Sequence, residues 1–358
     1  MSRAGRRFVA LLAGLVVALS GVEVGVRVFA PQPVAQAPLL RGMLTEPGDH
    51  RVQTPEYDVT VHTNSDGFVD GEWGGGAEPP RNAPPEIVVI GDSFVQAAQV
   101  APGLGYGAQL QADLAAAGVE TRVRSMGVPG AGTATALGVL DRWALPRHPA
   151  VVLLGFLVAN DVLNNHPLLE GKDDKPFYTL RNGQLVPVEA ADLVTDSPLW
   201  RWSAAWRWAT RTWTLRQVAE RRLALGEGLP LDLRVHDPRC VAGVCPTWEE
   251  AWAVTDALIA EMARRCGPET RFGVVLFPDR TQVEGRSDWP AAAGWDFSRA
   301  QARAAQVAAA HAPTLDLLPT LKQAGGDLYF PKDGHWTARG HAAAAAGSVE
   351  FVRGLLGR

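Results

Sequence analysis

Five residues from four separate places in the sequence have the types that acyl transfer through a serine requires. Ser93 supplies a hydroxyl, and His335 is a base that can take its proton near neutral pH. Asp333, two residues before this histidine, can accept the other ring N–H and fix the tautomer. The oxyanion needs fixed donors, and we expect the backbone N–H groups of Ser93 and Gly130 and the side-chain amide of Asn160 to supply them.

Each of these groups follows a segment with the pattern of a buried strand or lies in the last loop of the chain. Strands are expected at 87–90, 121–126, 151–154, 272–277 and 314–318, and helices at 106–117, 133–143, 298–311 and 337–356. The alternation predicts an α/β fold with a parallel, doubly wound sheet. Ligands bind beyond the carboxyl ends of such strands, so the polar groups are expected along one edge of the sheet.

Taken singly, each motif also has a purely structural interpretation. Gly91-Asp92-Ser93 reads as a strand-to-helix turn with a good N-cap, and Asn160-Asp161 reads as a turn pair. The glycine-rich run 127–132 lacks the Lys-Ser/Thr of a phosphate loop. His341 is the nearest competitor of His335, but it falls inside the closing helical pattern and is expected to be structural. The order of all four motifs on the predicted strand ends favours a catalytic interpretation.

The four motifs together resemble those of the SGNH hydrolases, also called GDSL esterases and lipases. The similarity covers about 100 residues, 87–165 and 327–347. The resemblance implies that Ser93 is the nucleophile, that His335 is the base with Asp333 as its partner, and that Gly130 and Asn160 complete the oxyanion hole. It also implies a flavodoxin-like, three-layer α/β/α sandwich, with no metal and no other cofactor.

Two of the motifs depart from the usual family pattern. Val158-Ala159 stand where a glycine usually lies close before the asparagine, which implies a narrower site. The family more often places its aspartate three residues before the histidine, a position that Lys332 occupies here. The run 333–336, Asp-Gly-His-Trp, instead resembles the alginate O-acetyltransferase-like branch, whose members modify exopolysaccharides in the periplasm. That similarity implies transfer to a carbohydrate hydroxyl as an alternative to hydrolysis.

The N-terminus has the pattern of an export signal. Arg3, Arg6 and Arg7 precede an uncharged apolar run, 8–22, and the basic flank is expected to stay in the cytoplasm. We expect residues 1–30 to be a retained signal anchor, a single membrane helix in which Glu23 and Arg27 pair, with the rest of the chain on the outer side of the cytoplasmic membrane. The alternatives are secretion after cleavage near Ala18-Leu19-Ser20 and a buried helix of a cytoplasmic protein.

The remaining chain is divided into a tether and pre-domain segment, 31–85, and a catalytic domain, 86–358. The first is rich in proline and glycine, and its Asn64-Ser65-Asp66-Gly67-Phe68 run resembles a turn that precedes the catalytic domain in anchored family members. Within the second, 164–271 is expected to be a helical insertion or cap. It contains an aromatic stripe at helical spacing, which either packs on the core or lies on the membrane surface: Leu199, Trp202, Trp206, Ala209 and Trp213.

Composition excludes several classes of protein. With 47% apolar and 20% charged residues, the 358-residue chain is neither disordered, collagen-like nor a polytopic membrane protein. A net charge of −4 argues against nucleic acid as a partner. In an oxidising compartment Cys240 and Cys245 could form a disulfide and leave Cys266 free. Zinc on His236 and this cysteine pair lacks the usual fourth ligand.

These observations lead to one main hypothesis and two alternatives. The first is a serine esterase of the cell envelope that hydrolyses a small acyl ester or an acylated carbohydrate through an acyl-serine intermediate. The second is an O-acyltransferase that passes the acyl group from the same serine to an envelope or exported polysaccharide. The third is a non-catalytic, membrane-anchored binding protein that has kept the fold. The sequence names no protein partner.

Overall fold

The computed structural model describes most of the chain outside the tether and part of the predicted insertion. The described residues are 2–30, 43–73, 83–170, 175–188, 203–206, 208–209, 212, 235–236, 246–285 and 295–358. The predicted Cys240–Cys245 disulfide lies outside the described residues, as do three positions of the predicted aromatic stripe, Leu199, Trp202 and Trp213.

The core of the protein is a five-stranded sheet with every neighbouring pair parallel. Its strands are β3 (Glu86–Gly91), β4 (Arg122–Gly127), β5 (Val151–Leu157), β8 (Arg271–Phe277) and β9 (Thr314–Asp316), in the spatial order β4-β3-β5-β8-β9. Ile87 pairs with Val123 on one side and with Val151 on the other. This is the flavodoxin-like order, in which the second strand lies outside the first. The predicted doubly wound parallel sheet is confirmed.

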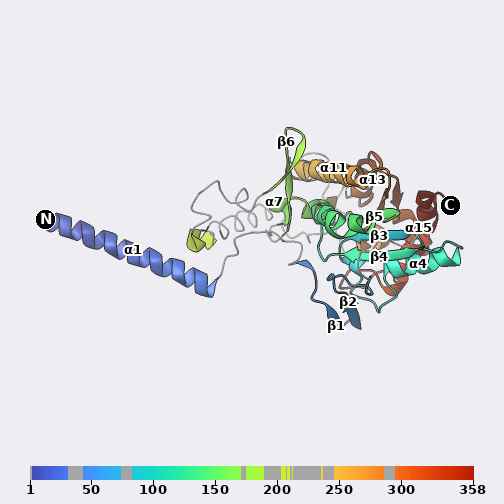
Figure 1. Cartoon of the computed structure of the whole chain (residues 1–358), viewed down its shortest axis with the longest axis horizontal. Coiled ribbons are helices and arrows are strands. Elements are labelled where there is room, and N and C mark those ends of the chain that lie inside the picture. Colours follow the sequence, from blue (N-terminus) through green and yellow to red (C-terminus); the bar gives the residue numbers. More distant parts are fainter. Residues whose placement is uncertain are drawn as a thin grey trace.

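Two layers of helices cover the sheet, because the central strands are apolar on both faces. Val88 and Ile90 point into a cluster with α5 (Thr133–Val139), α11 (Pro246–Cys266) and α13 (Ser298–Ala309). Ile87 and Val89 point into a second cluster with α4 (Tyr106–Ala116), α14 (Leu318–Ala324) and α15 (Ala338–Leu356). Figure 1 shows α11 and α13 on the opposite side of the strands from α4.

Several boundaries differ from the sequence-based expectation. The last strand ends at Asp316 rather than 318, because Leu318 already begins α14. The helix expected at 133–143 is α5 followed by a π-helical turn, η1 (Leu140–Ala144), and a 3₁₀ turn, η2 (Leu145–Arg147). Three short helices follow the ends of β3, β5 and β8: α3 (Ser93–Gln96), α6 (Asp161–Asn164) and α12 (Arg280–Glu284).

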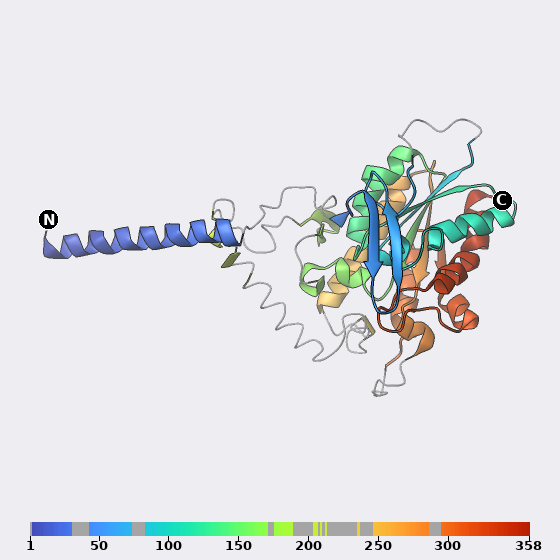
Figure 2. The same cartoon turned by 90° about the horizontal axis from the view of Figure 1, so that it is seen from below.

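Part of the segment expected to be a tether is folded. β1 (Gly48–Gln53) and β2 (Asp58–Thr63) form an antiparallel hairpin on the outside of the body (Figures 1 and 2). In the turn that follows, the Asn64 side chain accepts hydrogen bonds from the backbone of Asp66 and Phe68, and Gly67 has a φ of +94°. Phe68 is fully buried and stacks on Trp73. The asparagine, glycine and phenylalanine of this run therefore attach the hairpin to the core.

Between β5 and β8, the described residues are not only helical. They include α7 (Pro167–Glu170), α11 and a second hairpin, β6 (Tyr178–Arg181) with β7 (Gln184–Pro187). Asn182 and Gly183 connect its strands with φ values of +52° and +76°. An Asn-Gly pair is a strong hairpin signal, because both residues tolerate positive φ, so the sequence did contain a sign of this hairpin.

The N-terminal helix α1 (Arg3–Phe29) projects from the body as a single rod (Figures 1 and 2). It has no buried residue and is long and apolar enough to cross a membrane, a test that a signal sequence also passes. Glu23 pairs with Arg27 at 2.8 Å, as its i,i+4 spacing predicts. The Glu23 carboxylate also accepts backbone N–H groups of Ala204 and Ala205 at 2.8 and 3.0 Å.

Candidate active site

The carboxyl ends of β3 and β4 place Ser93 at the start of α3. Asp92 is the N-cap of this helix, and its carboxylate accepts the Phe94 N–H at 2.9 Å. Gly127, at the end of β4, allows α3 to pass directly over it: a Cβ there would lie 2.1 Å from the backbone nitrogen of Gln96. Close contact between strand and helix therefore requires glycine at this position and determines where Ser93 projects.

Ser93, His335 and Asp333 form a continuous chain of hydrogen bonds. The Ser93 hydroxyl lies 2.7 Å from His335 Nε2, and His335 Nδ1 lies 2.5 Å from Asp333 Oδ1. The serine and the histidine are 242 residues apart in sequence. If Nδ1 carries the ring proton and donates a hydrogen bond to the carboxylate, Nε2 is unprotonated and can accept the hydrogen bond of the serine hydroxyl. This is the tautomer that a general base for Ser93 requires.

The loop that carries His335 is closed by backbone bonds and held by an aromatic side chain. An isolated bridge joins Tyr329 and Trp336, and the Phe330 N–H donates to the His335 carbonyl at 2.8 Å. Trp336 is fully buried, with its ring 5.0 Å from that of Phe94 and 4.7 Å from that of Phe277. Deleting a buried aromatic side chain of this kind typically costs about 3–5 kcal/mol. The tryptophan of the Asp-Gly-His-Trp run therefore packs against the core rather than facing the cleft.

Two of the three residues expected to form the oxyanion hole line the same cleft, and the third does not. Ser93 and Asn160 both line a cleft of about 950 Å³ that also contains Asp333 and His335. The Asn160 side-chain nitrogen donates one N–H to Asp92 Oδ2 at 3.1 Å, which leaves its second N–H for another acceptor. Gly130 is not among the residues that line this cleft. Its carbonyl accepts a hydrogen bond from Lys175 at 2.6 Å, and its φ is +62°.

The cleft lining combines apolar and charged residues. Phe94, Leu157 and Ala159 contribute apolar surface. The charged residues of the lining include Asp279, Arg280, Glu284 and Lys332. A cleft with a small apolar part and a charged wall fits a short acyl group attached to a polar alcohol better than it fits a long hydrocarbon chain.

Three carboxyl groups around the serine have shifted pKa values of different sign. Burial raises the pKa of Asp92, and burial together with the charge of Asp92 raises that of Asp161 well above its ordinary value. Burial acts in the same direction on Asp333, but attraction to His335 and the hydrogen bond from Tyr57 outweigh it and hold the pKa of Asp333 below its ordinary range. The lowered pKa keeps the Asp333 carboxyl ionised at neutral pH.

Sequence reasoning missed the groups that hold these residues from outside their own motifs. Tyr57 and Glu56, in the turn between β1 and β2, contact the loop of Asp333. Lys175 is buried and pairs with Glu170 at 2.7 Å while it holds the Gly130 carbonyl. No motif or spacing marks these residues, because each contacts a segment far away in the sequence.

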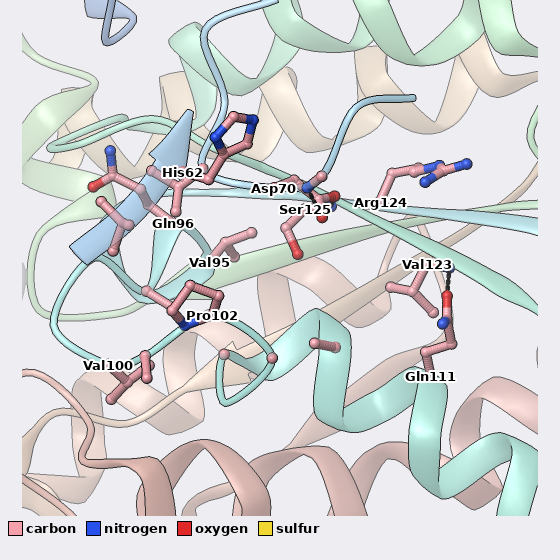
Figure 3. A pocket seen from close by; sticks show the side chains of 18 residues that line it. His62, Asp70, Val95, Gln96, Val100, Pro102, Gln111, Val123, Arg124 and Ser125 are labelled. Carbon is pink, nitrogen blue, oxygen red and sulfur yellow. Dashed lines mark hydrogen bonds between the residues drawn. The ribbon is translucent and has the colours of Figure 1, made fainter. Parts of the chain in front are cut away.

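A second cavity, of about 310 Å³, lies on the other side of α3 between β4 and the segment that follows β2 (Figure 3). Val95 and Gln96 line it, but Ser93, His335 and Asp333 do not. Asp70 reaches across from that segment and accepts the Ser125 N–H at 3.0 Å. The cavity therefore marks the contact between the hairpin segment and the edge strand rather than the site of the serine.

The described residues contain no group of three or more His, Cys, Asp or Glu side chains arranged to hold a metal ion. Of the three ligands considered for zinc, His236 is described, and it pairs with Asp279 at 2.8 Å. Cys266, the cysteine expected to be free, is buried and forms no disulfide within the described part of the chain. Burial raises the pKa of its thiol to about 12.

Comparisons with known proteins give one family and several distant structures. Residues 249–355 match the family model of the SGNH hydrolase-like domain of the acetyltransferase AlgX. No curated protein matches the sequence.

Three solved structures illustrate the structural matches. TesA is 15% identical, with 75% of this chain and 99% of that chain covered and a TM-score of 0.41. A lipase/acylhydrolase from Enterococcus faecalis is 17% identical, with 75% and 96% covered and a TM-score of 0.41. The acetyl xylan esterase AlAXEase is 12% identical, with 75% and 99% covered and a TM-score of 0.40. Similarities of this extent carry no argument about activity.

Proposed function

We propose that this chain, whose residues 249–355 match the SGNH hydrolase-like domain of the acetyltransferase AlgX, is a serine enzyme that transfers an acyl group through an ester on Ser93. The observation that supports this most directly is the hydrogen-bonded chain from the Ser93 hydroxyl through His335 to Asp333. A serine hydroxyl is a weak nucleophile until a base takes its proton, and this chain supplies both the base and the group that orients it.

In the first half-reaction the Ser93 oxygen attacks the carbonyl carbon of an acyl ester while His335 Nε2 takes the hydroxyl proton. The negative charge on the carbonyl oxygen is stabilised by the Ser93 N–H and the second side-chain N–H of Asn160, both of which line the cleft, whereas Gly130, the third expected donor, does not line it. The tetrahedral intermediate then loses the alcohol, which leaves with the proton from His335. Asp333 stays ionised and stabilises the protonated imidazole between the two steps.

In the second half-reaction an acceptor hydroxyl gives its proton to His335 and attacks the acyl carbon. The bond to Ser93 then breaks as His335 returns the proton to the Ser93 oxygen, which restores the hydroxyl. We propose that this acceptor is a carbohydrate hydroxyl. The match to an acetyltransferase domain and the charged wall of the cleft support this choice. Hydrolysis by water is the second candidate, because it uses the same acyl-serine and the apolar part of the cleft is small enough for a short ester.

The proposed location is the outer side of the cytoplasmic membrane. The supporting observation is the exposed apolar helix α1, which begins with Arg3, Arg6 and Arg7. Basic residues before a membrane helix remain on the cytoplasmic side, so the body of the protein would face outward.

A fluorophosphonate probe tests the nucleophile. The full-length wild type should be labelled, Ser93→Ala should not, and Ser125→Ala should be labelled like the wild type because Ser125 lines the other cavity. Persistent labelling of Ser93→Ala would refute the assignment of the nucleophile. A wild type that does not react would support the binding-protein alternative.

Product analysis then distinguishes the two acceptors. The enzyme is incubated with an acetyl ester, with and without an oligosaccharide, and acetylated sugar and free acetate are quantified. Sugar-dependent formation of a new ester supports transfer, whereas acetate that forms at the same rate in both reactions supports hydrolysis.

A further inference from the structure

The turn between β1 and β2 reaches the loop that carries Asp333. The Tyr57 hydroxyl donates to Asp333 Oδ2 at 2.8 Å, across 276 positions of sequence. Next to it, the Glu56 carboxylate accepts the backbone N–H of Lys332 at 2.9 and 3.1 Å and that of Asp333 at 2.7 Å. The hairpin segment thus contacts both the side chain and the backbone of the proposed partner of His335.

These contacts divide the two oxygens of Asp333 between two donors. Oδ1 lies 2.5 Å from His335 Nδ1 and also accepts the His335 backbone N–H at 3.2 Å. Oδ2 accepts the hydroxyl of Tyr57. With both oxygens engaged on opposite sides, the carboxylate cannot rotate about its terminal bond without losing one of these hydrogen bonds.

The turn itself is held in place before it meets the loop. The Thr54 hydroxyl accepts the backbone N–H groups of Glu56 and Tyr57 at 3.1 and 3.2 Å. Below the turn, Arg51 and Asp58 form a two-pronged ion pair across the strands, at 2.5 and 2.7 Å. At the other end of the segment, Asp70 holds the edge strand through Ser125 (Figure 3).

The Tyr57 ring adds an apolar contact, with its centroid 4.9 Å from that of Phe330 in the same loop. Burial, with a further contribution from the Asp333 carboxylate, raises the pKa of Tyr57 to about 12. The hydroxyl therefore stays protonated, and remains a donor, throughout the pH range in which a histidine base works.

We propose that Tyr57 and Glu56 are positioning residues for the Asp333–His335 pair, so that the hairpin segment before the sheet completes the active site. This inference rests on the proposed role of Ser93 and His335. Tyr57 fixes which oxygen faces the imidazole and withdraws charge from the carboxylate, while Glu56 fixes the backbone of the loop. Neither side chain touches the reacting atoms.

The test measures the second-order rate constant for inactivation of the full-length protein by a fluorophosphonate, from pH 5 to 9. This probe reports the activated serine and needs no acceptor. Tyr57→Phe removes one oxygen and keeps the ring against Phe330. We expect inactivation about tenfold slower at pH 7, because the Asp333 carboxylate loses a charge-assisted hydrogen bond that fixes its orientation.

The shape of the pH profile separates positioning from a general structural effect. Without the Tyr57 hydroxyl the Asp333 carboxylate is more basic and holds the protonated imidazole more strongly, so the acidic limb should move to higher pH. The other charged groups around this carboxylate are unchanged in the variant: Glu56 on the hairpin, Lys332 and His335 on the loop, and Arg280, which contacts the Pro331 carbonyl. The shift therefore reports the hydroxyl alone.

Two further variants complete the experiment. Tyr178→Phe, in the other hairpin, is the matched control and should react like the wild type at every pH. Glu56→Ala should slow inactivation, and Glu56→Gln, which keeps one acceptor oxygen, should restore part of the rate.

The outcomes distinguish this inference from the proposed function. A profile for Tyr57→Phe that superimposes on the wild type, or an acidic limb that moves to lower pH, overturns the positioning role while labelling of Ser93 in the wild type still stands. If the wild type itself does not react at Ser93, the proposed function fails first. A lowered melting temperature of Tyr57→Phe with an unchanged rate and profile would assign the contact to stability alone and also overturn the inference.

Discussion

His341 offers a quantitative test of how this protein responds to acid. It lies in α15, six residues after the proposed base, and only 1% of its surface is exposed. Its ring meets that of Trp336 edge to face at 5.4 Å, and neither ring nitrogen has a hydrogen-bond partner within the described part of the chain. Burial, assisted by the charge of His335, lowers the pKa of His341 from 6.5 to about 3.

The lowered pKa translates into a dependence of stability on pH. Between pH 6.5 and about 3 the unfolded chain binds a proton at His341 that the folded chain does not, so stability is present above pH 6.5 and is lost as the pH falls. At pH 5 the unfolded histidine is almost fully protonated, which amounts to about 2 kcal/mol of stability lost relative to pH 7. For a body of this size that corresponds to a decrease in melting temperature of about 4–8 °C.

The substitution His341→Met removes the titrating group and fills a similar volume with an apolar side chain. We expect the variant to be about as stable as the wild type at pH 7, since no hydrogen bond is lost, and more stable by about 2 kcal/mol at pH 5. Thermal unfolding of both proteins in the same detergent at the two pH values measures the difference. The control is His148→Asn. This substitution removes an exposed histidine whose φ is +51° and introduces asparagine, which tolerates a positive φ.

The lowered pKa of His341 would be refuted as the cause of acid sensitivity if wild type and His341→Met lost the same stability between pH 7 and pH 5. That result would mean that the buried imidazole has a partner for its proton, or that it becomes exposed without unfolding. Labelling of Ser93 should be retained in His341→Met, because the proposed base is His335.

Three further predictions concern the site. Asn160→Ala should lower kcat by about 10² to 10³, the usual effect of removing one oxyanion donor, and an unchanged kcat would assign that role to another group. His335→Ala should lower kcat by several orders of magnitude, about 10⁴ or more, because the serine loses its base; activity within about tenfold of wild type would contradict this role. Gly127→Ala places a methyl group 2.1 Å from the Gln96 nitrogen, so we expect about 1–3 kcal/mol of destabilisation in a melting experiment together with reduced labelling, and a wild-type melting temperature would show that α3 can move aside.

The parallel sheet was accessible from the sequence because buried parallel strands leave a local pattern, whereas the flavodoxin-like arrangement was expected from the family resemblance. The runs at β3, β5 and β8 are apolar on both faces. The ends of strands were less accessible from the sequence. β9 is two residues shorter than the predicted strand 314–318, because the buried residues Leu317 and Leu318 form the start of α14.

The hairpins were missed for different reasons. For β6–β7 a local signal existed in Asn182-Gly183. For β1–β2 the strands alternate half-buried and exposed residues, with Arg51 and Asp58 paired across them, so no apolar run marks them. Phe68 and Asp70 attach this segment to the body through contacts with residues that lie far away in the sequence.

The residues proposed for catalysis could be named in advance because each type carries its chemistry in its side chain. A serine after a buried strand, a histidine with an aspartate two residues before it, and an asparagine after another buried strand are features of the local sequence. What only the tertiary structure decided is how these groups are held: Tyr57 and Glu56 against the Asp333 loop, Lys175 on the Gly130 carbonyl, and Trp336 against Phe94. Such contacts join positions as far as 277 residues apart, and no periodicity or spacing encodes them, because they depend on which surfaces the folded sheet brings together.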